Sequence, residues 1–279
     1  MSDEQWIELF RNAAESANTA ICNVTDIDNV SDSVGAGGDR STRLDLASEN
    51  VILDAIRSSG QRCVVLSEEA GRISFNGASL ESDPLVIIDP LDGTNNRKRN
   101  FPVACISIAL WLKREPVVGV VYDLASGVCY VAARGAGAWI ASDAGNARIG
   151  VSKATSAEKA FVTLIRPVTK RDYLEMGDLF FGVKTARIVV SAALEMAWVA
   201  SGVTDAFVDV AYNSETKKGG IRLVDLAAGM LLVEEAGGVT WGSALSDIRD
   251  RYDVRQQTNF IGAASAPLLD ELQRLRWRS

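Results

Sequence analysis

The sequence predicts an α+β protein in which layers of β-sheet are covered by helices. Three observations lead to this fold class. An amphipathic helical pattern opens the chain, short apolar runs follow at hairpin spacing, and strand and helix patterns alternate over the second half. We expect an N-terminal α+β half over residues 1–140 and a C-terminal α/β half over residues 141–279, without a linker between them.

The first elements are two helices separated by a loop. Over residues 3–22 the apolar side chains fall on one helical face. The segment 31–41 is rich in Gly, Ser and Asp, which favours a mobile loop. Thr42 is a suitable N-cap for a second apolar-striped helix, which we expect to end at Gly60.

Strand patterns dominate the middle of the chain. Their separation by short polar turns predicts antiparallel hairpins, and Gly135 and Gly137 predict a further tight turn before a strand. The expected strands are 62–66, 85–88, 104–113, 117–123 and 128–133.

The second half alternates between the two periodicities. Strands are expected at 160–165, 186–189, 206–210, 239–241 and 259–263. Helices are expected at 170–180, 191–200, 223–236 and 267–277. Such alternation is typical of a sheet covered by helices.

Composition excludes several classes of function. The net charge of −7 argues against binding nucleic acid or an anionic membrane through charge. The chain contains no histidine, which excludes Ser-His-Asp and Cys-His catalysis and zinc sites that need imidazole. Carboxylates, hydroxyl groups, backbone groups and metal ions must therefore carry any enzymatic chemistry.

The remaining composition points to a cytoplasmic protein. The four cysteines are far apart and form no CxxC pair, so we expect free thiols in a reducing compartment. The N-terminus has no hydrophobic signal region. The longest nearly apolar stretch, residues 101–112, is too short to span a bilayer.

Acidic residues gather at the ends of predicted elements. Asp89 ends an apolar strand, and Pro90 is expected to turn the chain so that Asp89 and Asp92 converge on one point. Gly93 and Thr94 follow as the opening of a helix, whose free N–H groups attract anions such as phosphate. Oxygen ligands beside an anion site suit magnesium and a phosphorylated substrate, although the same spacing occurs in surface turns.

Two further acidic positions strengthen this interpretation. Glu68 and Glu69 end another apolar strand, and Asp225 begins an apolar helix. Each has an ordinary alternative: a solvated strand end for the glutamates, and a charge favoured by the helix dipole for Asp225. Acids at three element ends in one chain favour a common site.

These segments resemble the signatures of the inositol monophosphatase family of magnesium-dependent, lithium-sensitive phosphatases. The matching blocks are LSEEA (66–70), DPLDGTNN (89–96) and VDLAAGMLLVEEAGGV (224–239), with further similarity over 35–50 and 191–210. The segments around Asp45, Glu68 and Asp225 are most similar to the archaeal branch, whose members often act on both inositol 1-phosphate and fructose 1,6-bisphosphate. The resemblance implies a layered α-β-α-β-α sandwich and a homodimer.

The resemblance also implies a ligand set for two magnesium ions. Glu68, Asp89 and the Leu91 carbonyl would hold one ion, and Asp89, Asp92 and Asp225 a second. Glu69 is expected to lie outside this set. The 31–41 segment could help to bind a third ion, or could be a simple connector.

The same resemblance assigns roles around the substrate. Asp45 and Thr94 would orient or deprotonate the attacking water, although Asp45 alone reads as an ordinary helix acid. The N–H groups of Gly93 and Thr94 would hold the phosphate. The substrate contacts would be completed by Asn95, Ser191 and Asp209, the last having a solvated strand end as its alternative.

The implied activity is hydrolysis of inositol 1-phosphate, fructose 1,6-bisphosphate or both by metal-activated water. A 3′-phosphoadenosine 5′-phosphate phosphatase is one alternative. A non-catalytic, metal-binding regulatory protein is another. The expected partner is a small phosphorylated sugar or polyol.

The chain departs from the family pattern near the expected substrate. Val190 replaces a glycine, which is expected to narrow the pocket, and Ala211 replaces an arginine, which puts bisphosphate binding in doubt. Lys217 or Lys218 could restore the lost charge, or could belong to a solvated loop. The basic run 97–99 could attract anionic substrate or could be a solvated turn.

Overall fold

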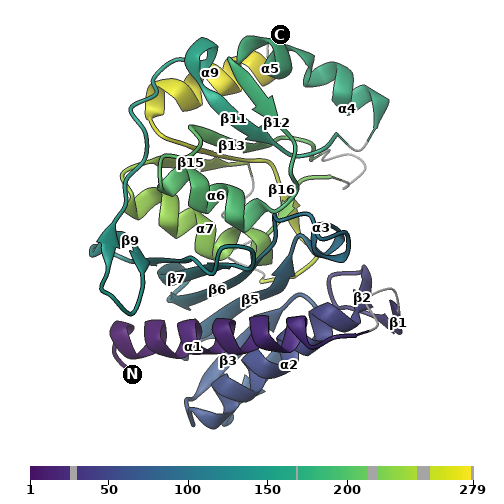
Figure 1. The fold of residues 1–279 in the computed structure, drawn as a ribbon, viewed down its shortest axis with the longest axis vertical. Coiled ribbons are helices and arrows are strands. Elements are labelled where there is room, and N and C mark those ends of the chain that lie inside the picture. Colours follow the sequence, from purple (N-terminus) through teal and green to yellow (C-terminus); the bar gives the residue numbers. More distant parts are fainter. Residues whose placement is uncertain (26–29, 168, 213–218, 244–251, 278–279) are drawn as a thin grey trace.

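The chain folds into five alternating layers of helix and sheet (Figure 1). This computed structural model describes residues 1–25, 30–167, 169–212, 219–243 and 252–277. The succession of layers is helix, sheet, helix, sheet, helix, which confirms the predicted α-β-α-β-α sandwich.

The first layer consists of two amphipathic helices, α1 (Asp3–Cys22) and α2 (Arg43–Ser58). Ser2 caps α1 and Thr42 caps α2, each accepting a hydrogen bond from a backbone N–H in the first turn. The apolar faces of both helices pack on one face of the larger sheet. Both predicted helices and the cap at Thr42 are therefore confirmed.

The second layer is an eight-stranded sheet in the order β10-β9-β8-β7-β6-β5-β3-β4. All neighbours pair antiparallel except β3 and β5, so the predicted hairpins are confirmed. Strand β4, which the sequence analysis missed, follows directly on the turn after β3. The strands are β3 (Cys63–Ser67), β4 (Gly71–Phe75), β5 (Leu85–Asp92), β6 (Cys105–Leu112), β7 (Glu115–Asp123), β8 (Cys129–Ala133), β9 (Gly137–Ala141) and β10 (Ala147–Arg148).

The expected turn at Pro90 is wrong. β5 continues through Pro90 to Asp92, and its register against β6 shifts between Asp89 and Asp92. In a regular strand, side chains three residues apart point to opposite faces. This irregularity, and not a turn, changes the direction in which the Asp92 side chain points relative to that of Asp89. The short helix α3 (Thr94–Lys98) follows at once.

The third layer is formed by α6 (Ala192–Ala200) and α7 (Leu223–Glu235), which lie between the two sheets. Small residues let these helices approach their neighbours closely. A Cβ atom on Gly119 of β7 would lie 2.9 Å from the carbonyl oxygen of Ala228, and one on Gly229 would lie 2.6 Å from Met196. The layer is therefore packed tightly on both sides, which fixes where α7 begins relative to the larger sheet.

The fourth and fifth layers complete the molecule. A five-stranded sheet has the order β12-β11-β13-β17-β15, and the outer helices cover it. The predicted helix 170–180 is divided at Met176 into α4 and α5. The elements are β11 (Phe161–Leu164), β12 (Thr185–Arg187), β13 (Ala206–Asp209), β15 (Val239–Gly242), β17 (Phe260–Ala263), α4 (Lys170–Glu175), α5 (Gly177–Gly182), α9 (Ala266–Arg276) and the 3₁₀ turn Ala157–Lys159.

Two small strand pairs lie beside the layers. β14 (Ile221–Arg222) pairs with β16 (Gln257–Thr258) just before α7. β1 (Val30–Val34) pairs with β2 (Arg40–Thr42), so the expected loop at 31–41 is instead an antiparallel hairpin. Its tip is attached to the end of β3, because Ala36 N–H and Gly37 N–H donate to the carbonyl oxygens of Glu69 and Glu68.

The division at residue 140 stays a prediction. Among the described helices, none is long and apolar enough to cross a bilayer.

Candidate metal site and active site

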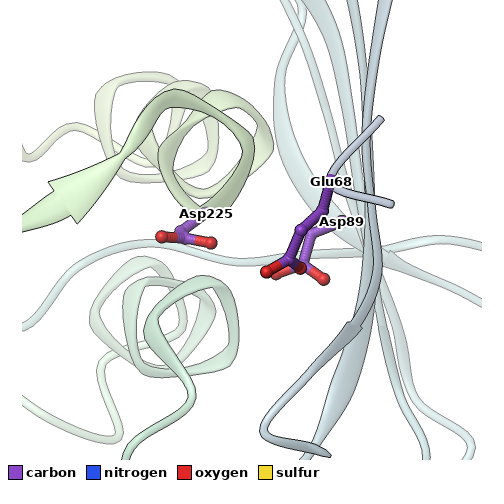
Figure 2. A group of neighbouring side chains, drawn as sticks. All are labelled: Glu68, Asp89 and Asp225. Carbon is purple, nitrogen blue, oxygen red and sulfur yellow. The ribbon is translucent and has the colours of Figure 1, made fainter. Parts of the chain in front are cut away.

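Three carboxylates from different elements point toward one another (Figure 2). Glu68 follows β3, Asp89 lies in β5, and Asp225 lies in the first turn of α7. One oxygen atom of each lies within 4.8 Å of the others. The parallel pairing of β3 with β5 brings Glu68 beside Asp89, and the packing of α7 on the sheet brings in Asp225. We call these three residues the acid cluster.

Burial and mutual repulsion raise the pKa values of carboxylates in the acid cluster. Burial raises the pKa of Glu68 to about 7, Arg222 opposes this rise, and Asp225 adds a smaller contribution. The pKa of Asp89 is raised well above its ordinary value, mainly by burial and then by Glu68 and Asp92. Converging carboxylate oxygens with this excess of negative charge are the donor set that magnesium prefers. The residues present therefore fit the metal that the sequence predicts.

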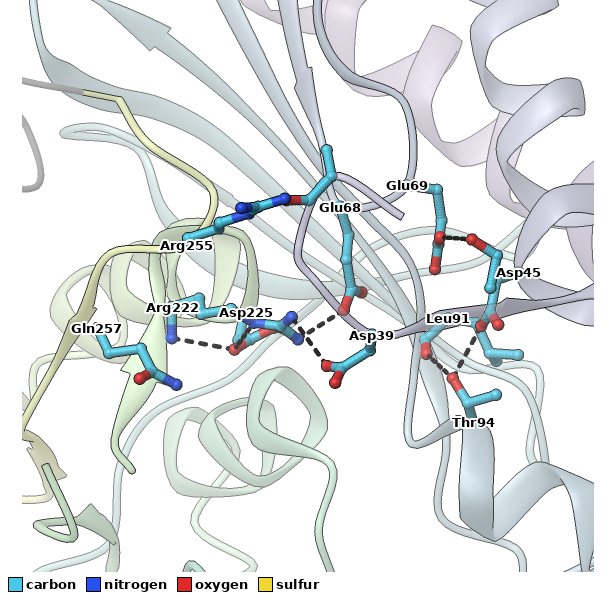
Figure 3. A network of polar contacts seen from close by, with 12 residues as sticks. Asp39, Asp45, Glu68, Glu69, Leu91, Thr94, Arg222, Asp225, Arg255 and Gln257 are labelled. Carbon is cyan, nitrogen blue, oxygen red and sulfur yellow. Dashed lines mark hydrogen bonds and ion pairs between the residues drawn. The ribbon is translucent and has the colours of Figure 1, made fainter. Parts of the chain in front are cut away.

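An arginine already contacts two members of the acid cluster (Figure 3). Arg222 Nη2 lies 2.6 Å from Glu68 Oε1, and Arg222 Nε lies 3.3 Å from Asp225 Oδ2. Its backbone N–H also donates to Asp225 Oδ2 at 3.0 Å, so the carboxylate caps α7 as well as joining the cluster.

Asp92 lies beside the acid cluster and is held by different partners. Its Oδ2 accepts hydrogen bonds from the backbone N–H of Ala193 at 2.7 Å and from the Ser191 hydroxyl at 3.1 Å. Burial raises the pKa of Asp92 to about 6, with a further contribution from Asp225, and the bonds from α6 oppose this rise. One oxygen of the predicted ligand Asp92 is thus directed toward the start of α6.

The structure brings Asp45 and Thr94 together, as the sequence analysis expects. Thr94 Oγ1 lies 2.8 Å from Asp45 Oδ1 and 2.9 Å from the carbonyl oxygen of Leu91. The other oxygen of Asp45 accepts the Thr42 N–H at 2.8 Å, and the side chain is buried. A hydroxyl beside a buried, oriented carboxylate can accept a hydrogen bond from a water while donating its own proton to the carboxylate.

The turn after β5 is built around a glycine. Gly93 has a φ of 91°, and a Cβ atom there would lie 2.7 Å from the carbonyl oxygen of Val103. Only glycine fits this position, which starts α3 directly beside Asp92. Asn95 is exposed on the first turn of α3.

The other predicted substrate contacts are buried. Ser191 has no exposed surface, and its hydroxyl is directed at Asp92. Asp209 is 1% exposed at the end of β13 and accepts the Ala211 N–H at 3.3 Å. Burial raises the pKa of Asp209 to about 7, so a solvated strand end no longer describes this residue.

Glu69 and the departures from the family pattern have defined surroundings. Glu69 accepts a hydrogen bond from the Ser41 hydroxyl, and Ala211 is buried. Val190 has a φ of 61° and is 44% exposed. The side-chain amide nitrogen of Asn96 lies 2.6 Å from the Val189 carbonyl oxygen and 3.1 Å from that of Val190, which holds this strained backbone. Lys217 and Lys218 lie outside the described residues.

Two charged residues of this region were not predicted from the sequence. The position of Arg222, three residues before Asp225, is a signal for a local ion pair. Glu195, one turn into α6, accepts the Ser191 N–H at 3.0 Å. Burial raises the pKa of Glu195 to about 8.

Comparisons with known proteins extend this picture to the whole chain. The profile of the inositol monophosphatase family matches residues 3–277. A fructose-1,6-bisphosphatase/inositol-1-monophosphatase from Methanothermobacter thermautotrophicus is 31% identical over 249 residues, which cover 86% of this chain and 84% of the relative. The Nus factor SuhB of Escherichia coli is 33% identical over 234 residues, covering 82% and 81% of the two chains.

A solved structure shows the same fold. The extragenic suppressor protein suhB from Bartonella henselae superimposes with a TM-score of 0.81 at 26% identity, and the match covers 99% of each chain.

Proposed function

The chain belongs to the inositol monophosphatase family and is a phosphoric monoester hydrolase, and from that premise we propose that it is a magnesium-dependent phosphatase of small phosphorylated sugars or polyols. The observation that carries this proposal is the convergence of Glu68, Asp89 and Asp225 within 4.8 Å. Inositol 1-phosphate and fructose 1,6-bisphosphate are the proposed substrates.

The proposed ligands follow from the donor atoms. Glu68, Asp89 and the Leu91 carbonyl would hold one magnesium ion, and a second would share Asp89 with Asp92 and Asp225. Bound magnesium would lower the pKa of the attacking water and offset charge on the phosphoryl oxygens. For the second ion, Asp92 would offer the oxygen that does not bind Ser191 and Ala193.

The attacking water is assigned to Asp45 and Thr94. The contact of 2.8 Å between Thr94 Oγ1 and Asp45 Oδ1 lets the hydroxyl donate to the carboxylate and accept from water. The buried carboxylate would then draw the water's proton toward Thr94 as the oxygen attacks phosphorus. Backbone N–H groups of Gly93 and Thr94, at the start of α3, would bind the phosphoryl oxygens. The products are an alcohol and inorganic phosphate.

The substrate is proposed by analogy with the archaeal relative and by the surroundings of the site. The relative from M. thermautotrophicus is named for both activities. Val190 and Ala211 favour the smaller monoester over the bisphosphate, because Val190 exposes a branched side chain beside Ser191 and Ala211 provides no charge. Asn95 and the basic residues of α3 would contact or attract the anion.

Phosphate release from a panel of esters tests the proposal. The panel contains inositol 1-phosphate, fructose 1,6-bisphosphate, glycerol 2-phosphate and 3′-phosphoadenosine 5′-phosphate, each with magnesium, with EDTA and with added lithium. We expect magnesium-dependent, lithium-inhibited turnover of the first, and its loss in Asp92→Asn. Turnover that survives this substitution would refute the ligand assignment.

The regulatory alternative rests on the relative that is named as a Nus factor. It predicts magnesium binding without turnover of any ester in the panel. Preference for the nucleotide would instead support the 3′-phosphoadenosine 5′-phosphate phosphatase.

A homodimer in the cytoplasm is part of the same proposal. Light scattering after size exclusion tests the dimer.

A further inference from the structure

The guanidinium group of Arg222 lies against the acid cluster, where a bound cation would also have to lie. It contacts Glu68 at 2.6 Å and Asp225 at 3.3 Å, and these carboxylate side chains are only 16% and 14% exposed. Ion pairs so poorly exposed are screened little by water and salt. Arg222 therefore supplies positive charge to carboxylates that burial would otherwise favour in the protonated form.

The same guanidinium also reaches the β1–β2 hairpin. Arg222 Nη1 lies 3.5 Å from Asp39 Oδ2, and the Asp39 side chain is 88% exposed (Figure 3). A Cβ atom on Gly37 would lie 2.8 Å from Arg222 Nη1, so the hairpin packs directly against the guanidinium. Asp39 thus offers Arg222 an acidic partner that does not belong to the acid cluster.

These contacts place two cations in competition for the same oxygen atoms. A divalent cation bound by Glu68 or by Asp225 would be repelled by the guanidinium, which lies at hydrogen-bond distance from both carboxylates. Binding therefore requires Arg222 to withdraw from at least one of them. Asp39, which lies 3.5 Å from Arg222 Nη1, is a charged partner that Arg222 can keep when it loses a contact with the cluster.

We propose that Arg222 is the resident counter-ion of the acid cluster and sets its affinity for divalent cations, with Asp39 retaining the arginine when a cation binds. This inference rests on the proposed function, in which Glu68 and Asp225 are metal ligands. Arg222 is a positioning residue, because it acts through these two carboxylates. Its role is to keep the cluster paired in the metal-free protein at the cost of weaker metal binding.

Calorimetric titration with Mg²⁺, without substrate, tests the proposal in Arg222→Gln. We expect the dissociation constant to fall by about tenfold or more, because the competing charge is gone. The thermal midpoint in EDTA should fall, since Glu68 and Asp225 lose their counter-ion, and the rise in midpoint on adding Mg²⁺ should grow. Asp39→Asn should instead weaken Mg²⁺ binding by about two- to fivefold, because the withdrawn arginine loses its partner.

Arg255→Gln is the matched control. Arg255 also carries one positive charge beside the hairpin, where its Nε donates to the Ala36 carbonyl at 2.8 Å. Its described contacts do not include the acid cluster. We therefore expect its Mg²⁺ dissociation constant to stay within about twofold of the unmodified protein.

The outcomes separate this inference from the proposed function. If the unmodified chain binds no Mg²⁺, both fail. If it binds Mg²⁺ and Arg222→Gln binds no more tightly, only the role of Arg222 fails. If Arg255→Gln binds Mg²⁺ as much more tightly as Arg222→Gln does, the cause is the loss of one positive charge from the region, and the specific role of Arg222 fails. Should Arg222→Gln not fold, Asp39→Asn leaves Arg222 in place and changes only an exposed side chain, and unchanged Mg²⁺ binding in that variant overturns the proposal.

Discussion

Two groups of poorly exposed acids near the helix layer are stabilised in different ways. The acid cluster of Glu68, Asp89 and Asp225 is compensated by a full positive charge on Arg222. The second group, Asp92, Asp209 and Glu195, accepts hydrogen bonds from neutral donors such as backbone N–H groups. The first arrangement can exchange one cation for another, whereas Asp209 and Glu195 in the second can exchange only protons.

The contrast teaches that an acidic residue and low exposure do not together define a metal site. All six carboxylates are at least half-buried. Only in the first group do the oxygen atoms converge with a cation as partner. Asp92 stands between the groups, since it adjoins Asp89 and Asp225 while α6 binds one of its oxygens.

The largest expected effect comes from a substitution that tests whether only the acid cluster is needed for Mg²⁺ binding. Asp89→Asn should reduce phosphatase activity by about three orders of magnitude or more and abolish calorimetric Mg²⁺ binding, because it removes the ligand shared by both proposed ions. Its thermal midpoint in EDTA should not fall, since a buried charge is removed. Asp209→Asn is the control and should retain Mg²⁺ binding. Loss of binding in both variants would show that the two groups are not distinct.

An intermediate effect is expected on the free energy of unfolding, which depends on the protonation of Glu195 in the second group. The pKa of Glu195 rises from an ordinary 4.5 to about 8 in the folded state, so the folded protein binds this proton more tightly than the unfolded chain does. Its contribution to the free energy of unfolding is therefore lost as pH rises from about 4.5 to about 8, by a few kcal/mol in total. Glu195→Gln should remove this part of the pH dependence.

Chemical denaturation at a series of pH values measures this pH dependence of the free energy of unfolding. Exposed Glu4→Gln serves as the control and should leave the profile unchanged. A Glu195→Gln profile that is parallel to that of the unmodified protein would contradict the assignment of the proton.

The smallest expected effect lies at the edge of the second group. Val190→Gly should leave the free energy of unfolding unchanged or raise it by up to about 1 kcal/mol, because glycine relieves the strain at a φ of 61°. Val203, which is 59% exposed, has no such strain, and Val203→Gly should cost about 0.5–1 kcal/mol. Urea denaturation of both variants measures the difference, and equal losses would count against strain at Val190.

Local patterns in the sequence were sufficient to predict most of the fold. The 20 residues of α1 and the hairpins β6–β7 and β7–β8 have strong periodicity and clear turns, and both are confirmed. The hairpin at β1–β2 was missed because Gly, Ser and Asp are as typical of hairpin turns as of irregular loops. Pro90 was misinterpreted because a bulged strand tolerates proline.

The candidate site was predictable only in part, for a related reason. The acids at the ends of β3 and β5 and at the start of α7 are local features, so their motifs locate them. The partners of those acids depend on which elements pack together. Neither the pairing of Asp92 with α6 nor the reach of Arg222 to Asp39 has a signal in the local sequence.

The position of α6 and α7 between the two sheets has a consequence for biosynthesis. The face of the larger sheet that they cover is complete by residue 148, but α7 ends at Glu235. During translation, apolar residues such as Val64, Ile87 and Val121 on that face stay uncovered while nearly ninety further residues are added. The nascent chain thus exposes a large apolar surface for several seconds at ordinary elongation rates of about 5–20 residues per second, a period in which it is prone to aggregate.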